Sequence, residues 1–239
     1  MKILIPMAGE GSRFAKEGYT FPKPLIDVGG KPMIQRVVEN LDFDCEYIFL
    51  VRKEHLKKYE GLRDTLEMIT NKKMKIVEVD GLTEGAACTA LLAKEFIDNN
   101  ESLLIANSDQ IIEYEAENFK SLINLTDVDS IVWCFNDVHP KWSFVKTNAR
   151  GFVTEVAEKR PISDIATCGI YWYRKGSDFV KSAEKMIEKD VRVNNEFYIA
   201  PVYNQMIEGG KTLIPFYVHK MHGIGTPEDL SNYLGARNV

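Results

Sequence analysis

A glycine-rich turn near residue 10 is the first place where the residues could do chemistry. The turn, AGEGSRF at residues 8–14, follows the apolar run KILIPM and contains Gly9, Gly11 and Ser12, with Arg13 directly behind them. A strand that ends in such a turn exposes backbone N–H groups that form an anion-binding nest. Because glycines let the backbone approach an anion closely, Ala8, Gly9, Gly11 and Ser12 are predicted to bind a phosphorylated ligand. A bare turn explains the glycines about equally well.

Two common nucleotide-binding motifs do not fit this turn. The dinucleotide fingerprint G-x-G-x-x-G has Phe14 where a third glycine is needed for close helix–strand packing. The P-loop pattern is absent. Arg13 differs in kind from both motifs, because a guanidinium beside a nest suits a polyanion whose charge grows during a reaction.

A second cation follows ten residues later. Lys23 lies between Pro22 and Pro24 in the segment FPKPLIDVGGKPMI (21–34). Proline fixes φ and restricts the preceding residue, so this unit is predicted to hold its lysine on a stiff, extended segment. We expect Lys23 to point at the same anion as Arg13, the alternative being a solvated loop lysine.

A carboxylate follows another buried strand. Asp109 lies in the segment SDQ that follows the apolar run SLLIAN (102–107), and ligands of open α/β sheets bind beyond the carboxyl ends of the strands. Mg²⁺ is commonly held by one or two carboxylates together with phosphate oxygens. Asp109 is therefore a candidate Mg²⁺ ligand, while an ordinary turn aspartate is an equal alternative.

Two further polar groups lie in the second half of the chain. Glu158 and Lys159 end a predicted hairpin, and Asn195 and Glu196 stand just before a predicted helix. Taken alone, the first pair suits a charged strand end and the asparagine suits a helix cap. The same positions could also form a polar pocket for a second substrate.

The elements that position these residues alternate between strands and helices in the first half. Strands are predicted at 2–7, 46–51, 74–79, 102–107 and 130–135, and helices at 32–41, 53–70 with a break at Gly61, 86–98 and 115–125. After about residue 140 a hairpin over 144–158 and strands at 166–174 and 212–218 are predicted, with helices at 177–189, 198–208 and 226–236. This order favours one α/β domain with a mostly parallel sheet and a β-rich second half.

Composition excludes several classes of protein. The 239 residues carry a formal net charge of −5, which argues against a general nucleic-acid binder. The four cysteines form no CxxC pair, which argues against a disulfide framework or a cysteine zinc site. No apolar run approaches the roughly 20 residues of a membrane helix, and no secretory leader is evident. We expect a cytoplasmic enzyme without a membrane or nucleic-acid partner.

Seven segments, taken in their order along the chain, resemble those of a known protein family. The chain resembles the sugar-1-phosphate nucleotidyltransferases, also called nucleoside-diphosphate-sugar pyrophosphorylases, in MAGEGSRF, FPKPLIDVGGKPMI, EGAACTAL, NSDQ, VAEKRP, NNEFY and GIGTPEDL. The resemblance covers nearly the whole chain. It implies a Rossmann-like α/β/α sandwich over residues 1–239, with a nucleotide-binding half (about 1–135) and an acceptor-binding half (about 136–239). Family members are often homo-oligomers.

The resemblance also implies roles for individual residues. Arg13 would hold the triphosphate, Lys23 would bridge phosphates at the reacting centre, and Lys159 would lie near the acceptor phosphate. Gly85 would lie against the nucleobase and Asp109 would hold Mg²⁺. The acceptor would contact Glu158, Asn195 and Glu196. The implied reaction joins an NTP to a sugar-1-phosphate, making a nucleotide-sugar for surface polysaccharide synthesis.

Two departures from the family pattern keep alternatives open. Gly223 stands where the family usually has an aspartate that is a second Mg²⁺ ligand, and EGAACTAL lacks the glutamine common in the base-reading loop of several subfamilies. One alternative is a cytidylyltransferase that acts on a phosphorylated amine or amino-acid derivative. Another is a nucleotide-binding relative without catalytic activity.

Overall fold

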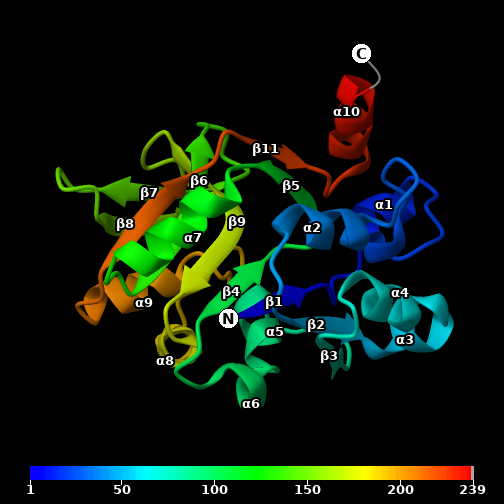
Figure 1. The fold of residues 1–239 in the computed structure, drawn as a ribbon, viewed down its shortest axis with the longest axis horizontal. Coiled ribbons are helices and arrows are strands. Elements are labelled where there is room, and N and C mark those ends of the chain that lie inside the picture. Colours follow the sequence, from blue (N-terminus) through cyan, green and yellow to red (C-terminus); the bar gives the residue numbers. More distant parts are fainter. Residues whose placement is uncertain (238–239) are drawn as a thin grey trace.

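A nine-stranded sheet runs through the centre of the computed structural model, which describes residues 1–237 (Figure 1). A separate two-stranded sheet brings the strands of the described residues to eleven. They are β1 (Lys2–Pro6), β2 (Glu46–Arg52), β3 (Met74–Val79), β4 (Leu103–Ala106), β5 (Gln110–Glu113), β6 (Ser130–Asn136), β7 (Ser143–Thr147), β8 (Val153–Glu158), β9 (Ile165–Tyr173), β10 (Leu213–Tyr217) and β11 (Lys220–Gly223). Seven of them follow the order β10-β6-β9-β4-β1-β2-β3, the β7–β8 hairpin joins at β9, and β5 pairs with β11 separately.

Most neighbouring strands on the seven-strand path are parallel. β1 pairs in parallel with β2 and β4, β2 with β3, and β6 with β10. β9 runs antiparallel between β4 and β6. The carboxyl ends of β1, β3 and β4 therefore meet at one edge of the sheet, which is where ligands bind in open α/β sheets.

Helices cover both faces of this sheet. They are α1 (Ser12–Lys16), α2 (Met33–Leu41), α3 (Lys53–Lys58), α4 (Gly61–Ile69), α5 (Ala86–Leu91), α6 (Lys94–Ile97), α7 (Ala116–Leu125), α8 (Gly176–Glu188), α9 (Val202–Glu208) and α10 (Pro227–Arg237), with a 3₁₀ turn, η1, at Lys23–Leu25. Successive residues of β1 enter opposite cores: Leu4 packs with α5, α8 and α9, and Ile3 and Ile5 pack with α2, α4 and α7. This alternation follows from the two-residue period of a strand.

A third, smaller hydrophobic core packs α1 and α2, from the first part of the chain, against α10 from its last part. Phe14 of α1 and Met33 of α2 pack with Ile224 and with Leu230 of α10. Figure 1 shows α10 standing beside α1 and α2, apart from the main body of helices. The C-terminal helix therefore closes over the segment that follows β1.

Most predicted elements are confirmed, including the break at Gly61 and the β-rich second half. The predicted helix over 86–98 is wrong as one element, because the amides of Leu92 and Ala93 donate to carbonyls only three residues back and α5 ends there. The helix predicted from 198 begins instead at Val202, since Pro201 restricts the residue before it and lacks an amide hydrogen. The short elements α1, η1, β5 and β11 were not predicted.

No helix within residues 1–237 is long and apolar enough to cross a membrane.

Candidate active site

A cavity of about 780 Å³ opens at the carboxyl edge of the sheet. Its walls include the segments that follow β1 and β4, together with the end of β8 and the start of β9. A volume of this size is in the range of pockets that enclose small molecules. Of the predicted site residues, the cavity is lined by Ala8, Gly9, Gly11, Ser12, Arg13, Lys23, Gly85, Asp109, Glu158, Lys159 and Glu196.

The glycine-rich turn forms one wall of the cavity. Gly11 has a left-handed φ of 63° and is the N-cap of α1, and its carbonyl accepts hydrogen bonds from the amides of Phe14 and Ala15 at 3.0 and 3.2 Å. Phe14 is 1% exposed and anchors the short helix in the third core. The residue that breaks the dinucleotide fingerprint therefore packs the turn against the protein.

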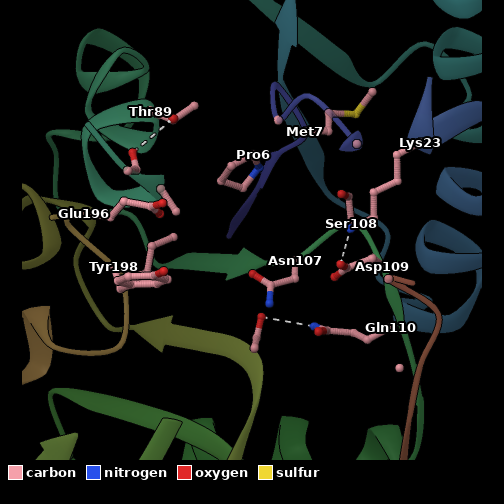
Figure 2. Close-up of a pocket in the computed structure, with 18 of the residues that line it drawn as sticks. Pro6, Met7, Lys23, Thr89, Asn107, Ser108, Asp109, Gln110, Glu196 and Tyr198 are labelled. Atoms are coloured by element: carbon pink, nitrogen blue, oxygen red, sulfur yellow. Dashed lines mark hydrogen bonds and ion pairs between the residues drawn. The ribbon is translucent and has the colours of Figure 1, made fainter. Parts of the chain in front are cut away.

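Arg13 and Lys23 differ in whether their positive charge is paired with a carboxylate. The Lys23 ammonium forms an ion pair with Asp109 Oδ2 (Figure 2). Arg13 is exposed and has no ion pair or side-chain hydrogen bond within the described residues. One cation is thus already neutralised by a carboxylate, and the other is available to a ligand.

The conformation around Lys23 differs from the extended one predicted. Lys23 is the first residue of η1: the Leu25 amide donates to the Pro22 carbonyl at 2.8 Å and the Ile26 amide to the Lys23 carbonyl at 3.2 Å. Pro24 fits within this turn because its missing amide hydrogen is not needed in the first turn of a helix. Lys23 is therefore held in a half-buried 3₁₀ turn that follows Pro22 and contains Pro24, rather than on an extended segment.

The β5–β11 pair holds Asp109 against Lys23. The Ile224 amide donates to the Asp109 carbonyl at 2.9 Å. A Cβ at Gly225 would lie 2.4 Å from Asp109 Oδ2 and 3.4 Å from Lys23 Nζ. Gly225 therefore leaves the space that this ion pair occupies.

Gly223 lies near Asp229, and a Cβ at this position would fit in ordinary van der Waals contact. A Cβ at this position would meet nothing closer than 3.7 Å, and the Asp229 carboxylate would be 3.8 Å away. Asp229 lines the cavity, accepts a hydrogen bond from Thr226 at 2.8 Å and lies 3.4 Å from Lys141 Nζ. Asp229 lies in the first turn of α10 and also reaches the cavity.

The opposite end of the cavity carries two carboxylates and one cation. Figure 2 shows Glu196 and Tyr198 across the cavity from Lys23 and Asp109. Burial raises the pKa of Glu158 above its usual range, and the charge of Glu196 adds to this, against a hydrogen bond from Ser143 and the nearby Lys159 cation. This end can bind a phosphate through Lys159 and polar or cationic groups through the acids.

Gly85 lies where the backbone before α5 meets the backbone of Phe197. Its φ is 133°, and a Cβ there would lie 2.5 Å from the backbone nitrogen and oxygen of Phe197. The Phe197 amide donates to the Glu84 carbonyl at 2.8 Å, and the Ala87 amide donates to the Phe197 carbonyl at 2.9 Å. A glycine is needed here for the backbones to meet, whatever base lies against it.

Asn195 is the predicted site residue that the structure leaves outside the cavity lining. Asn194 and Asn195 have left-handed φ values of 49° and 64°, in a turn closed by mutual hydrogen bonds between Val193 and Glu196. Asparagine tolerates this conformation. The turn lies several residues before α9 and presents Glu196, rather than Asn195, to the cavity.

Several lining residues were missed by sequence reasoning. Asn107 and Gln110 flank Asp109, and a Cβ at Gly169 would lie 2.2 and 2.7 Å from their side chains. A signal was available, because Asn107 ends the predicted buried strand 102–107 and Gln110 lies three residues beyond it. Lys141, Trp142 and Tyr198 also line the cavity, but they lie on loops that only the tertiary fold brings there.

The residues present fit a magnesium ion that arrives with a nucleotide. Residues 1–237 contain no cluster of three His, Cys, Asp or Glu side chains that could hold a metal ion by themselves. Asp109 faces the cavity beside the predicted phosphate site, and Mg²⁺ often takes only one or two carboxylates plus phosphate oxygens and water. Asp109 would thus supply one carboxylate to a Mg²⁺ ion that arrives with a nucleotide.

Comparison with known proteins identifies the family. The model of the nucleotidyl transferase family matches residues 2–233. The chain belongs to the nucleotidyl transferase family. A nucleoside-diphosphate-sugar pyrophosphorylase from Vibrio cholerae RC9 has a similar structure, with a TM-score of 0.81 and 26% identity over 98% of this chain and 99% of that chain. The chain therefore has the predicted Rossmann-like α/β/α sandwich.

Curated relatives share parts of the sequence of this chain. The bifunctional protein GlmU of Methanococcus aeolicus is 27% identical over 72% of this chain and 39% of that protein. A UTP–glucose-1-phosphate uridylyltransferase of Staphylococcus haemolyticus is 29% identical over 52% of this chain and 50% of that protein. The chain thus spans half or less of the length of these relatives.

Proposed function

We propose that the protein transfers the nucleoside monophosphate of an NTP to a sugar-1-phosphate and releases pyrophosphate. The observation that carries this proposal is a single cavity in which Arg13 and Lys23 lie at one end, Lys159 lies at the other, and Asp109 pairs with Lys23. Family membership and the similarity to a nucleoside-diphosphate-sugar pyrophosphorylase support the same reaction. The product would be an activated nucleotide-sugar, and surface polysaccharide synthesis is a use that fits it.

The reaction needs charge neutralisation more than proton transfer. An oxygen of the acceptor phosphate attacks the α-phosphorus of the NTP, and the bond from that phosphorus to the bridging oxygen breaks as pyrophosphate leaves. A phosphate monoester is already ionised near pH 7, so no general base is required. Two polyanions must approach each other, and preorganised cations are the main way to stabilise the transition state.

Each group in the cavity then has a defined task. Arg13 binds the triphosphate from the glycine-rich turn, and Lys23 contacts the phosphates at the reacting centre once it leaves Asp109. Asp109 would hold Mg²⁺, which neutralises phosphate charge when bound. Lys159 receives the acceptor phosphate.

A second candidate keeps the reaction and changes the acceptor. Glu158 and Glu196 place two carboxylates beside Lys159. This charge pattern also fits a cytidylyltransferase whose acceptor carries an amine as well as a phosphate, such as a phosphorylated amine or amino-acid derivative.

A matrix of substrates tests the proposal and separates the candidates. Each of the four NTPs is combined with sugar-1-phosphates and with phosphorylated amines, and pyrophosphate release is measured with Mg²⁺ and with a chelator in its place. We expect pyrophosphate only when an NTP, a sugar-1-phosphate and Mg²⁺ are all present. Turnover with the amines alone would favour the second candidate. Calorimetric binding of an NTP without pyrophosphate from any acceptor would instead indicate the non-catalytic relative that Gly223 suggests.

A further inference from the structure

Tyr198 contacts the cation at the acceptor end of the cavity. The Lys159 ammonium donates a hydrogen bond to Tyr198 Oη at 2.6 Å and lies 4.5 Å from the centre of the tyrosine ring. Both residues line the cavity. We propose that Tyr198 is a positioning residue, which holds the Lys159 ammonium where the acceptor phosphate binds. This inference rests on the proposed function.

The backbone of Lys159 has a fixed conformation, but its side chain is flexible and needs a partner to hold it in one position. Lys159 has a left-handed φ of 53°, and its amide donates to the Trp142 carbonyl at 3.0 Å. A left-handed conformation costs a residue other than glycine roughly 1–2 kcal/mol, so the surrounding structure imposes it. The lysine side chain beyond it is a flexible four-carbon stem.

Tyr198 restrains this stem without neutralising its charge. Within residues 1–237 the Lys159 ammonium forms no ion pair, whereas Lys23 is paired with Asp109. A phenol oxygen and an aromatic face attract a cation and leave its net charge intact. The arrangement therefore keeps a full positive charge available for a phosphate.

Tyr198 is itself held in a rigid segment. Its neighbours Phe197 and Ile199 are 1% and 4% exposed. Phe197 is hydrogen-bonded on both sides to the segment around Gly85. The place of the Lys159 ammonium is thereby set by the loop that lines the nucleotide end of the same cavity.

A purely structural role for Tyr198 makes a different prediction. If the ring only fills the cavity wall, removing its hydroxyl changes nothing, and any effect of Tyr198 is independent of Lys159. If Tyr198 acts through Lys159, the hydroxyl matters and its effect depends on the lysine. A double-mutant cycle separates the two cases.

The test compares the parent, Tyr198→Phe, Lys159→Ala and the double variant, using the NTP and acceptor that the substrate matrix selects. We expect Tyr198→Phe to raise the acceptor KM about 3- to 10-fold, the loss of one hydrogen bond, with the NTP KM and thermal unfolding unchanged. In the Lys159→Ala background the same change should have no further effect. Tyr217→Phe, at an exposed tyrosine of β10, is the matched control.

Three outcomes would overturn the inference. Tyr198→Phe could leave the acceptor KM at the parent value, its effect could persist in the Lys159→Ala background, or Lys159→Ala could be silent. A parent that releases no pyrophosphate with any pair of substrates refutes the proposed function itself. A parent that turns over while Tyr198→Phe matches it refutes only the role of Tyr198.

Discussion

At the scale of single residues, the cations that line the cavity are of two kinds: those paired with a carboxylate and those without an ion pair. Lys23 is paired with Asp109, whereas Arg13 and Lys159 form no ion pair within the described part of the chain. Phosphates can bind the two unpaired cations directly. In the proposed reaction they compete with Asp109 for Lys23, and Asp109 would hold the metal ion. The Lys23–Asp109 pair therefore keeps two reactive groups together before the substrates arrive.

Glu158 gives a prediction about pH at this scale. Burial raises the pKa of Glu158 above the usual glutamate value, so the folded state disfavours the ionised carboxylate. As pH rises, Glu158 ionises at a lower pH in the unfolded state than in the folded state. The free energy of unfolding therefore falls between the unfolded pKa, about 4.3, and the raised folded pKa. Glu158→Gln removes this loss. We expect the variant to have the higher free energy of unfolding at pH 7 and no advantage below about pH 4.

Urea unfolding at a series of pH values measures this difference. Glu155→Gln, on the same strand, is the control, because Glu155 forms an exposed ion pair with Arg160 and such pairs contribute little. A Glu158→Gln variant that is less stable than the parent at pH 7 would contradict the assignment.

At the scale of elements, close approaches between segments shape the site. Gly85 allows the α5 loop to meet Phe197, and Gly225 allows the segment after β11 to meet Asp109. Both contacts join parts of the chain that are more than 100 residues apart. The site therefore depends on the absence of side chains as much as on their presence.

Gly225→Ala tests this at one position. The added methyl group would lie 2.4 Å from Asp109 Oδ2, so Asp109 must rotate away from Lys23. We expect a fall in turnover of at least about 10-fold, since losing a well-placed electrostatic group can cost 100-fold or more, with only a small change in thermal unfolding. Gly223→Ala is the matched control, because its methyl group meets nothing closer than 3.7 Å. Equal turnover in the two variants would show that the Lys23–Asp109 geometry is unimportant.

Sequence patterns predict the long elements and the residues directly attached to them. Arg13 and Asp109 could be assigned to one edge of the sheet because each follows a strong apolar run. The four-residue strands β5 and β11 were missed, because QIIE and KMHG are too short to show a clear alternation. Tyr198 and Lys141 were missed for another reason. They enter the cavity from loops, and only the tertiary fold determines where those loops lie.

At the scale of the whole molecule, the cavity combines segments from the entire chain. The net charge is −5, yet Arg13, Lys23 and Lys159 all line the cavity, which in the proposed function binds two anions. Residues of the C-terminal region, including Thr226 and Asp229, line the same cavity as the glycine-rich turn. Nucleotide and acceptor are therefore expected to bind in one cavity, close enough for direct transfer between them.

The most direct test of this account is the rate of pyrophosphate release by Lys23→Ala, measured with the NTP and acceptor that the parent accepts. Lys16→Ala is the control, because Lys16 is exposed at the end of α1 and does not line the cavity. We predict a loss of about 100- to 1,000-fold for Lys23→Ala, by analogy with the loss of one oxyanion-stabilising donor, and an unchanged rate for the control. A Lys23→Ala enzyme that turns over at nearly the parent rate would contradict the central claim that the cavity cations carry nucleotidyl transfer.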